Sequence, residues 1–332
     1  MLLPFSGGVD ALLLLIIAMI LDACIGDARW LARLLPAPAT LFATITARLD
    51  RRLNRIDRTD STRRLRGALT ALGLVALAIL LGLALSFVAR SVRFGAVLEL
   101  LVLFRAVTLR LPWAVMGRTL GALEAGNLEA ARDAVAPLTD RQCWSLDHHG
   151  VVRAAVEGMA LRFACGMVAP AFWYALFGLA GLLGWAAIDG VARIIGHDVP
   201  RFRYFGAVAR QLQRIAGFPA MLLAVLALLL AASFVPHGKA LAGVRGVKAA
   251  RRHPWGTMAL PVAAVAGILD LALGGPRREG EMVVKEPWIG DGRARALARD
   301  LRVAMALYIV AALIMACLVM GAGVAVHYQL WT

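Results

Sequence analysis

The chain has 332 residues, of which 61% are hydrophobic and only 17% are charged, and its formal net charge is +15. Soluble domains hold about 25% charged residues, so this composition excludes an ordinary water-soluble protein and indicates that lipid is much of the solvent. The basic residues are mostly arginines placed between long apolar runs, which suits loops facing anionic head groups or phosphorylated ligands. A nucleic-acid-binding protein needs a soluble basic domain, and none is visible, so no nucleic-acid partner is expected.

The apolar segments, taken in chain order, predict membrane-spanning helices. A helix needs about 20 apolar residues to cross the hydrocarbon core, and only a helix satisfies its own backbone hydrogen bonds there. Four segments meet this length without a charge: Ala68–Ala89, Phe163–Ile188, Gly217–Val235 and Val303–Val326. Three weaker segments are short or interrupted: Ala11–Leu21, Phe94–Phe104 and Gly256–Leu269. The sequence therefore predicts an all-α, polytopic integral membrane protein with five to seven transmembrane helices and a polar helical layer.

The polar stretches between these segments divide what we expect to be a single membrane domain over residues 1–332. Residues 29–66 form the most basic stretch, predicted to be a cytoplasmic loop by the excess of positive charge. Residues 118–162 are predicted to form a polar helical hairpin, with a first helix over Leu123–Val135. Residues 277–302 are expected to form a polar loop before the last helix. The expected location is the inner (cytoplasmic) cell membrane, crossed several times.

No common nucleotide-binding, dehydrogenase or hydrolase motif is present, since the sequence lacks GxxxxGK[ST], GxGxxG, HExxH and GxSxG. The four cysteines form no CxxC pair and predict no metal or redox site. Ionisable groups at membrane depth are costly, so polar residues near helix ends are candidates for function. Glu157 lies in a mostly apolar helix, and Arg153, one turn earlier, is its expected partner. Gly290-Asp291-Gly292 can equally be a simple turn.

Several motifs, taken in order, carry a resemblance to a known family. They begin at Leu21-Asp22 and Gly26-Asp-Ala-Arg-Trp30 and continue with Arg51-Arg-Leu-Asn54, Ala122–Arg132, Val156-Glu157, Gly196-His197 and Tyr204-Phe-Gly206. The last ones are Ala250-Arg-Arg-His-Pro254, Gly274-Gly-Pro276 and Pro287-Trp-Ile-Gly-Asp-Gly292. In this order and spacing the chain resembles the adenosylcobinamide-phosphate synthase family, the cobalamin biosynthesis proteins CbiB or CobD.

The resemblance implies a membrane enzyme of the ligase type that joins adenosylcobyric acid, a corrinoid, to aminopropanol or its phosphate, driven by ATP and Mg²⁺. It implies as partners the lipid bilayer and these two substrates, and it leaves a homo-oligomer or another membrane protein open as a further partner. Ligands for the metal are not assigned. The candidate catalytic residues are Glu157, Asp189, His197 and Asp291. The candidate substrate-binding residues are Arg153, Arg203, Tyr204, Arg251, Arg252, His253 and Trp288.

The chain also departs from the family pattern at polar positions. Where the family has Glu-Asn-Thr-x-x-Asp, this chain has Leu161-Arg-Phe-Ala-Cys165, and where it has Asn-Thr-Leu-Asp-Ser-Met, this chain has Asp189-Gly-Val-Ala-Arg-Ile194. Leu or protonated Cys cannot replace a hard oxygen ligand of Mg²⁺. The alternative interpretation is therefore a catalytically degenerate homologue that acts as a ligand-binding or accessory membrane protein. A transporter would require two related halves with broken helices, and the sequence shows none.

Overall fold

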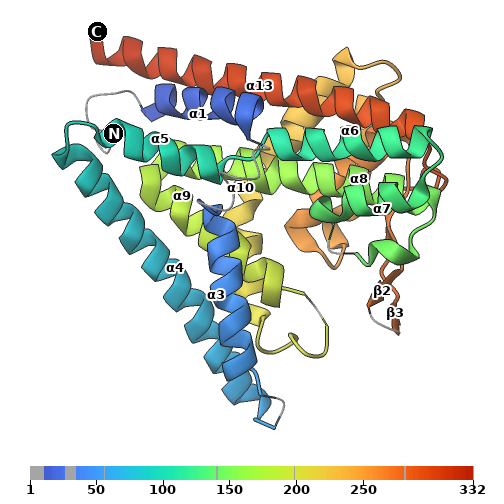
Figure 1. Cartoon of the computed structure of the whole chain (residues 1–332), viewed down its shortest axis with the longest axis horizontal. Helices are drawn as coiled ribbons and strands as arrows, with labels where there is room; N and C mark the ends of the chain where they lie inside the picture. Colours follow the sequence, from blue (N-terminus) through green and yellow to red (C-terminus); the bar gives the residue numbers. More distant parts are fainter. Residues whose placement is uncertain are drawn as a thin grey trace. The chain divides into compact units, whose positions relative to one another are not determined.

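The computed structural model describes residues 11–26, 35–55, 57–139, 141–197, 199–279 and 282–331 (Figure 1). Within these ranges the chain is almost entirely helical, which confirms the all-α fold class. The helices are α1 (Ala11–Ile25), α3 (Pro38–Leu53), α4 (Asp60–Ser91), α5 (Gly95–Ala106), α6 (Arg110–Glu124), α7 (Leu128–Val135), α8 (His148–Phe163), α9 (Ala169–Ile195), α10 (Ala207–Ala231), α11 (Ala240–Ala249), α12 (Ala259–Leu269) and α13 (Ala298–Trp331).

Five helical stretches of the described residues are long and apolar enough to cross a membrane: Asp60–Ser91, Gly95–Glu124, His148–Ile195, Ala207–Phe234 and Ala298–Ala325. Each of the four charge-free segments lies in a different one of these stretches, to within one residue at its end, and the weaker Phe94–Phe104 segment lies largely in Gly95–Glu124. The other two weak segments form shorter apolar helices, over Ala11–Ile25 and Gly256–Leu269. The protein is thus a polytopic membrane protein, and the predicted range of five to seven spans is confirmed.

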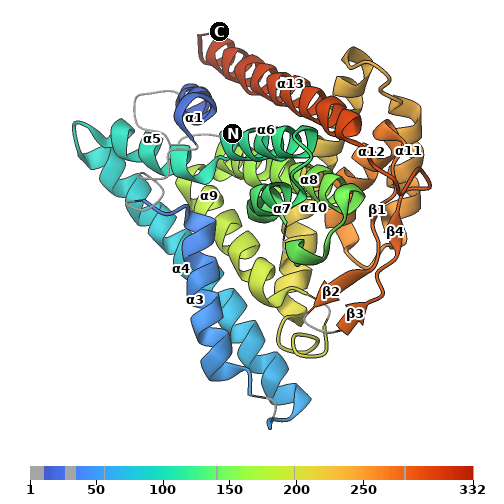
Figure 2. The same ribbon diagram turned by 45° about the vertical axis from the view of Figure 1, so that its right-hand side comes forward.

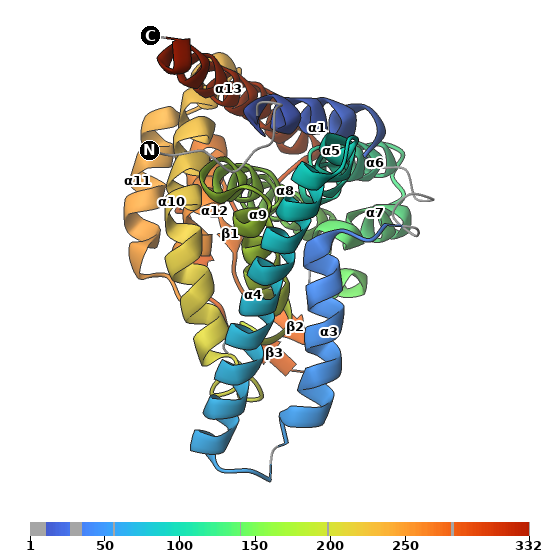
Figure 3. The same cartoon turned by 90° about the vertical axis from the view of Figure 1, so that its left-hand side faces the viewer.

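The chain forms two compact units. Unit 1 comprises Met1–Val107, Ala169–Phe218 and Val319–Thr332. In it, α3 and α4 lie side by side and pack against α9 (Figures 1 and 3). A glycine in α4 permits a close backbone approach, because a Cβ on Gly67 would lie 1.9 Å from the carbonyl oxygen of Phe205.

Unit 2 comprises Thr108–Val168 and Pro219–Leu318. In it, α6 and α7 pack against each other and against α8, and α11 packs along α12 (Figure 2). The stretch predicted as a polar loop before the last helix contains short strands. Strand β1 (Leu273–Gly274) pairs antiparallel with β4 (Trp288–Ile289), and β2 (Arg277–Glu279) pairs with β3 (Met282–Val284).

The segment predicted as one uninterrupted helix over Phe163–Ile188 is interrupted twice. A π-helical turn occupies Ala164–Val168, and Gly178 in α9 has φ +60° and ψ −148°. Pro170 has no backbone N–H, so it cannot bond the carbonyl four residues earlier, at Gly166. That carbonyl instead accepts a hydrogen bond of 2.8 Å from the Thr108 N–H. The break is therefore compensated inside unit 2.

Two expectations for the polar stretches were wrong. The helix expected over Leu123–Val135 is divided, since α6 ends at Glu124, Gly126 has φ +72°, and α7 begins after Asn127. The Asn127 side chain caps α7 by accepting from the Ala130 N–H at 3.0 Å, which fixes the new start. The described part of the predicted basic loop over residues 29–66 contains α3 and the start of α4.

Candidate functional site

Glu157 lies at the centre of the buried polar group in unit 2. Its carboxylate forms an ion pair with Arg141, with 3.1 Å between Arg141 Nη2 and Glu157 Oε2. The two side chains are only 10% and 9% exposed. A buried charge is stable only when it is paired and hydrogen-bonded, and this pair satisfies both conditions.

The expectation that Arg153 neutralises Glu157 was wrong. Arg141 lies 16 residues before Glu157, in the segment between α7 and α8, and no helical spacing pointed to it. Arg153 instead donates to the Ala294 carbonyl and lies 4.0 Å from Asp147. Asp147 is the N-cap of α8, where its carboxylate accepts from the Gly150 N–H at 2.6 Å.

Glu157 also connects α8 to the Gly274-Gly275 turn. The Gly274 N–H donates to Glu157 Oε2 at 3.2 Å. Both glycines have positive φ, +70° and +76°, which favours glycine over other residues. A Cβ on Gly275 would lie 2.7 Å from the Trp288 ring, so the bare glycine backbone forms the surface on which this indole rests.

Arg153 and Trp288 form the outer part of the same group. The Arg153 guanidinium carbon lies 5.6 Å from the centroid of the Trp288 ring, within range of a cation–π interaction. Trp288 is 45% exposed, so its ring remains available to a ligand. His253 contacts the residue that precedes Trp288, with 3.3 Å between His253 Nε2 and the Pro287 carbonyl oxygen. We call Arg141, Glu157, Gly274, Arg153, Trp288 and His253 the Glu157 group.

The remaining candidates of unit 2 are more exposed. Arg251 and Arg252 are exposed in a short 3₁₀ turn that also precedes His253. Asp291 is exposed between Gly290, whose φ is +91°, and Gly292, which packs on the Asp270 backbone. The turn interpretation of this motif is therefore confirmed, whatever further role Asp291 has.

The other sequence candidates lie in unit 1, around the C-terminal end of α9. Asp189 is buried and pairs with Arg193 at 2.5 Å, one helical turn later. His197 Nε2 lies 2.8 Å from the Arg193 carbonyl oxygen. Arg210 donates to the carbonyls of His197 and Arg203. Tyr204 is half-buried and Arg203 is exposed in the following turn.

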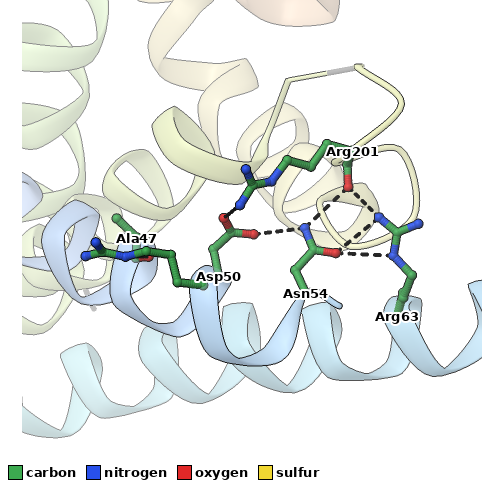
Figure 4. Close-up of polar contacts among 6 residues, drawn as sticks. Ala47, Asp50, Asn54, Arg63 and Arg201 are labelled. Atoms are coloured by element: carbon green, nitrogen blue, oxygen red, sulfur yellow. Dashed lines mark hydrogen bonds and ion pairs between the residues drawn. The ribbon is translucent and has the colours of Figure 1, made fainter. Parts of the chain in front are cut away.

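A second polar network in unit 1 was missed by the sequence reasoning (Figure 4). Asp50 pairs with Arg201 at 2.6 Å and accepts from the Asn54 amide at 2.8 Å. Arg63 donates to Asn54 Oδ1 through Nε and Nη2, and Nη2 also donates to the Arg201 carbonyl at 2.6 Å. Asn54 belongs to a family-like motif, but nothing in the sequence placed its neighbours. We call Asp50, Asn54, Arg63 and Arg201 the Asp50 network.

Neither group resembles a preformed metal centre. Among the residues that the structure describes, no three or more His, Cys, Asp or Glu side chains gather closely enough to hold a metal ion. Both carboxylates, Glu157 and Asp50, accept hydrogen bonds from arginine, which competes with a cation for the same oxygens. The Glu157 group instead offers a cation beside an exposed aromatic face, an arrangement suited to anionic ligands with a planar apolar part.

Comparison with known proteins gives the chain a consistent set of relatives. A family model described as CobD/Cbib protein matches residues 15–308. The chain is 37% identical to the cobalamin biosynthesis protein CobD of a Sinorhizobium species, over 93% of this chain and 97% of that protein. It is 34% identical to the protein of the same name from Sinorhizobium fredii, over 90% and 93%, and 32% identical to that of Rhodobacter capsulatus, over 89% and 92%. No solved structure matches the chain.

Proposed function

The chain belongs to the CobD/CbiB family of cobalamin biosynthesis proteins, and from this premise we propose that it catalyses an amide-forming step of that biosynthesis at the inner membrane. The reaction joins a carboxyl group of adenosylcobyric acid to the amine of aminopropanol or its phosphate, with ATP and Mg²⁺. The observation that supports this most is the match across almost the whole chain, which includes every residue of the Glu157 group.

The proposed chemistry requires the carboxylate to be activated before an amine can attack it. Transfer of the γ-phosphoryl group of ATP to a carboxylate oxygen breaks its bond to ADP and forms a C–O–P linkage. Attack by the amine then forms the C–N bond, breaks the C–O bond and releases phosphate and a proton. Mg²⁺ would spread the negative charge of the phosphates during this transfer. Such a metal is commonly held by substrate phosphates with one or two carboxylates, so it requires no complete protein cage.

Within the Glu157 group, we assign substrate contacts to the outer residues. Arg153 has N–H groups beyond the one bonded to Ala294, and these can bind the carboxylates of a corrinoid or a phosphate. The exposed Trp288 ring offers an apolar face to the corrin macrocycle. Arg251 and Arg252 add positive charge in the same unit and are assigned to phosphate.

Glu157 has a different assigned role, because Arg141 and Gly274 already engage its oxygens. Its carboxylate positions the Gly274-Gly275 turn and, through that turn, the Trp288 ring. Asp189, His197, Arg203 and Tyr204 of unit 1, and Asp291 and His253 of unit 2, remain candidate residues for the reaction.

The direct test incubates the purified protein in detergent with ATP, Mg²⁺, adenosylcobyric acid and aminopropanol phosphate, and measures the amide product by mass spectrometry. The expected result is product that depends on all four components. Arg153→Gln should raise the KM for the corrinoid about tenfold, the effect of about 1.4 kcal/mol of lost binding. Arg245→Gln, which removes an exposed arginine of α11 in the same unit, is the matched control and should leave the KM unchanged.

A growth experiment separates this function from an accessory role. A bacterium that lacks its own family member and needs cobalamin should grow on the amide product without the gene, and on adenosylcobyric acid only with it. If the protein supports growth only together with a second, intact family member, the proposed activity is contradicted.

A further inference from the structure

The helices α3 and α4 each change abruptly from uncharged to strongly basic. In α4 no charged residue occurs from Gly67 to Ala89, whereas Arg63, Arg64 and Arg66 come immediately before. In α3 the first ten residues, Pro38–Ala47, are uncharged, and arginines follow from Arg48 onward. Each helix therefore contains a boundary between an apolar part and a basic part.

The structure places these two boundaries side by side. Phe42 of α3 belongs to the same buried cluster as Ala78 of α4, well inside both apolar parts. At the other end, the Asn54 side chain just after α3 bonds Arg63 of α4 at 3.2 Å. The two helices thus run antiparallel (Figure 3). The apolar part of one therefore lies beside the apolar part of the other, and the basic parts likewise lie together.

The apolar part of α4 fits the thickness of a bilayer. More than 20 uncharged residues at about 1.5 Å each span roughly 30 Å or slightly more, the thickness of the hydrocarbon core. Leu72, Leu80 and Phe87 on this part are exposed, as expected of side chains that face lipid. Since α4 crosses the core with these residues, Arg64 and Arg66 lie at the level of the head groups.

Most arginines near this boundary are not used inside the protein. Arg63 is buried in the Asp50 network, and Arg201 pairs there with Asp50 although its side chain is 53% exposed. We define the basic surface as the exposed arginines of α3, of the α3–α4 connection and of the start of α4, together with two exposed arginines that follow α9 in the same unit. They are Arg48, Arg51, Arg52, Arg55, Arg58, Arg64, Arg201 and Arg203.

Acidic residues offset little of this positive charge. Asp50 is buried and already paired with Arg201, which leaves Asp57 and Asp60 as the exposed acids of the α3–α4 connection. The Asp50 network also fixes the basic surface, because it ties the end of α3, the start of α4 and the chain at Arg201 together.

We propose that the basic surface binds the head groups of anionic phospholipids, so that the α3–α4 connection lies on a negatively charged leaflet. The apolar span of α4 places its basic end at the bilayer boundary, the packing of α3 along α4 brings the arginines of α3 to the same end, and their excess of charge is complementary to lipid phosphates. Long arginine side chains reach from a helix surface to head groups, and each such residue strengthens attraction to an anionic membrane. This inference does not depend on the proposed amide-forming reaction.

The experiment reconstitutes the full-length protein into liposomes of phosphatidylcholine with a minor fraction of phosphatidylglycerol. The protein is then extracted in mild detergent, and the ratio of the two lipids that remain bound is measured by mass spectrometry. Phosphatidylglycerol should be enriched relative to the starting liposomes. The enrichment should fall steeply when extraction is done at about 1 M salt, where screening shortens the range of charge interactions to about 3 Å.

Two matched variants locate the binding. Replacing Arg51, Arg52, Arg55 and Arg58 by Gln should lower the enrichment about fivefold or more, whereas replacing the same four by Lys should preserve most of it. A lipid surface responds to charge, whereas a site built for one phosphorylated molecule or an acidic protein responds to the planar guanidinium.

Three outcomes would overturn the proposal: a bound lipid ratio equal to that of the liposomes, enrichment that is insensitive to salt, or loss of enrichment in the Lys variant. Gel filtration and thermal unfolding of each variant check that it folds. The salt dependence of the unmodified protein tests the proposal even if the Gln variant does not fold.

Discussion

Each compact unit contains a buried carboxylate paired with an arginine, but water reaches the two pairs to very different extents. In unit 2, Arg141 and Glu157 are 10% and 9% exposed. In unit 1, Asp50 is enclosed, whereas the Arg201 side chain that pairs with it is 53% exposed. When one partner of an enclosed pair is removed, the other partner remains as an unpaired buried charge, which costs much free energy. An arginine that stays in water, in contrast, loses little free energy when its carboxylate partner is removed. The same chemical pair should therefore matter very differently to stability in the two units.

The largest expected effect is at Arg141. Arg141→Met leaves the Glu157 carboxylate buried without its cation and should lower the free energy of unfolding by about 3–5 kcal/mol. The measurement is the unfolding midpoint in detergent micelles. The double variant Arg141→Met/Glu157→Met removes both charges and should recover much of the loss. Equal destabilisation in the single and the double variant would mean that packing, and not the uncompensated charge, dominates.

Arg63 should give an intermediate effect. Arg63→Met keeps the apolar stem but leaves Asn54 Oδ1 and the Arg201 carbonyl without this donor, and one unsatisfied group costs about 1–3 kcal/mol. Nearby water can reach part of this region, so the loss should be smaller than at Arg141. Protease cleavage in the α3–α4 connection should become faster along with the drop in unfolding midpoint. An unchanged cleavage rate and midpoint would contradict the role assigned to the Asp50 network.

Asp50→Asn should have a still smaller effect, about 0–1 kcal/mol. The Arg201 guanidinium that loses its partner is 53% exposed and stays in water, and the new asparagine oxygen can still accept from the Asn54 amide. A loss as large as that of Arg141→Met would show that the two pairs are equivalent and would remove the contrast between the units.

The smallest expected effect is on the labelling rate of Cys143, which lies in the same segment as Arg141. Burial raises the pKa of the Cys143 thiol, and the Asp133 carboxylate raises this pKa further. Less thiolate is then present at pH 7–8, so maleimide labelling should be slower than for an ordinary cysteine and should speed up as the pH rises. Asp133→Asn should increase the rate a few-fold, measured with Cys24, Cys165 and Cys317 replaced by Ser. A rate unaffected by Asp133→Asn would exclude this electrostatic contribution.

The fold was largely predictable because its main signal is local. Charge-free segments of sufficient length must be helices in lipid, and all four of them are found in long helices. What failed were features set by single residues, such as Gly126, whose positive φ divides α6 from α7. The site was predictable only in part, because its contacts join residues that are not neighbours on one helix. Glu157 was visible as a carboxylate in an apolar helix, but its partner comes from an irregular segment without periodicity.

The Asp50 network shows the limit more clearly. Asp50 and Arg201 are separated by 151 positions in the chain, and one sequence contains no signal that joins them. Asn54 stood in a recognisable motif, which marked it as noteworthy without saying what it contacts. The charged boundary in α3 and α4 could be read from the sequence, but only the antiparallel packing showed that the two boundaries coincide.

The order of the segments in the two units has a consequence for biosynthesis of the polypeptide itself. Unit 1 is interrupted after Val107 and resumes at Ala169, after the first part of unit 2 has already been made. Helices α3 and α4 emerge from the ribosome long before α9, against which they pack. They must therefore wait in the bilayer with that surface covered by lipid or by a chaperone. Because the segments of the two units alternate along the chain, cutting the gene at one position would not give a fragment that encodes one complete unit.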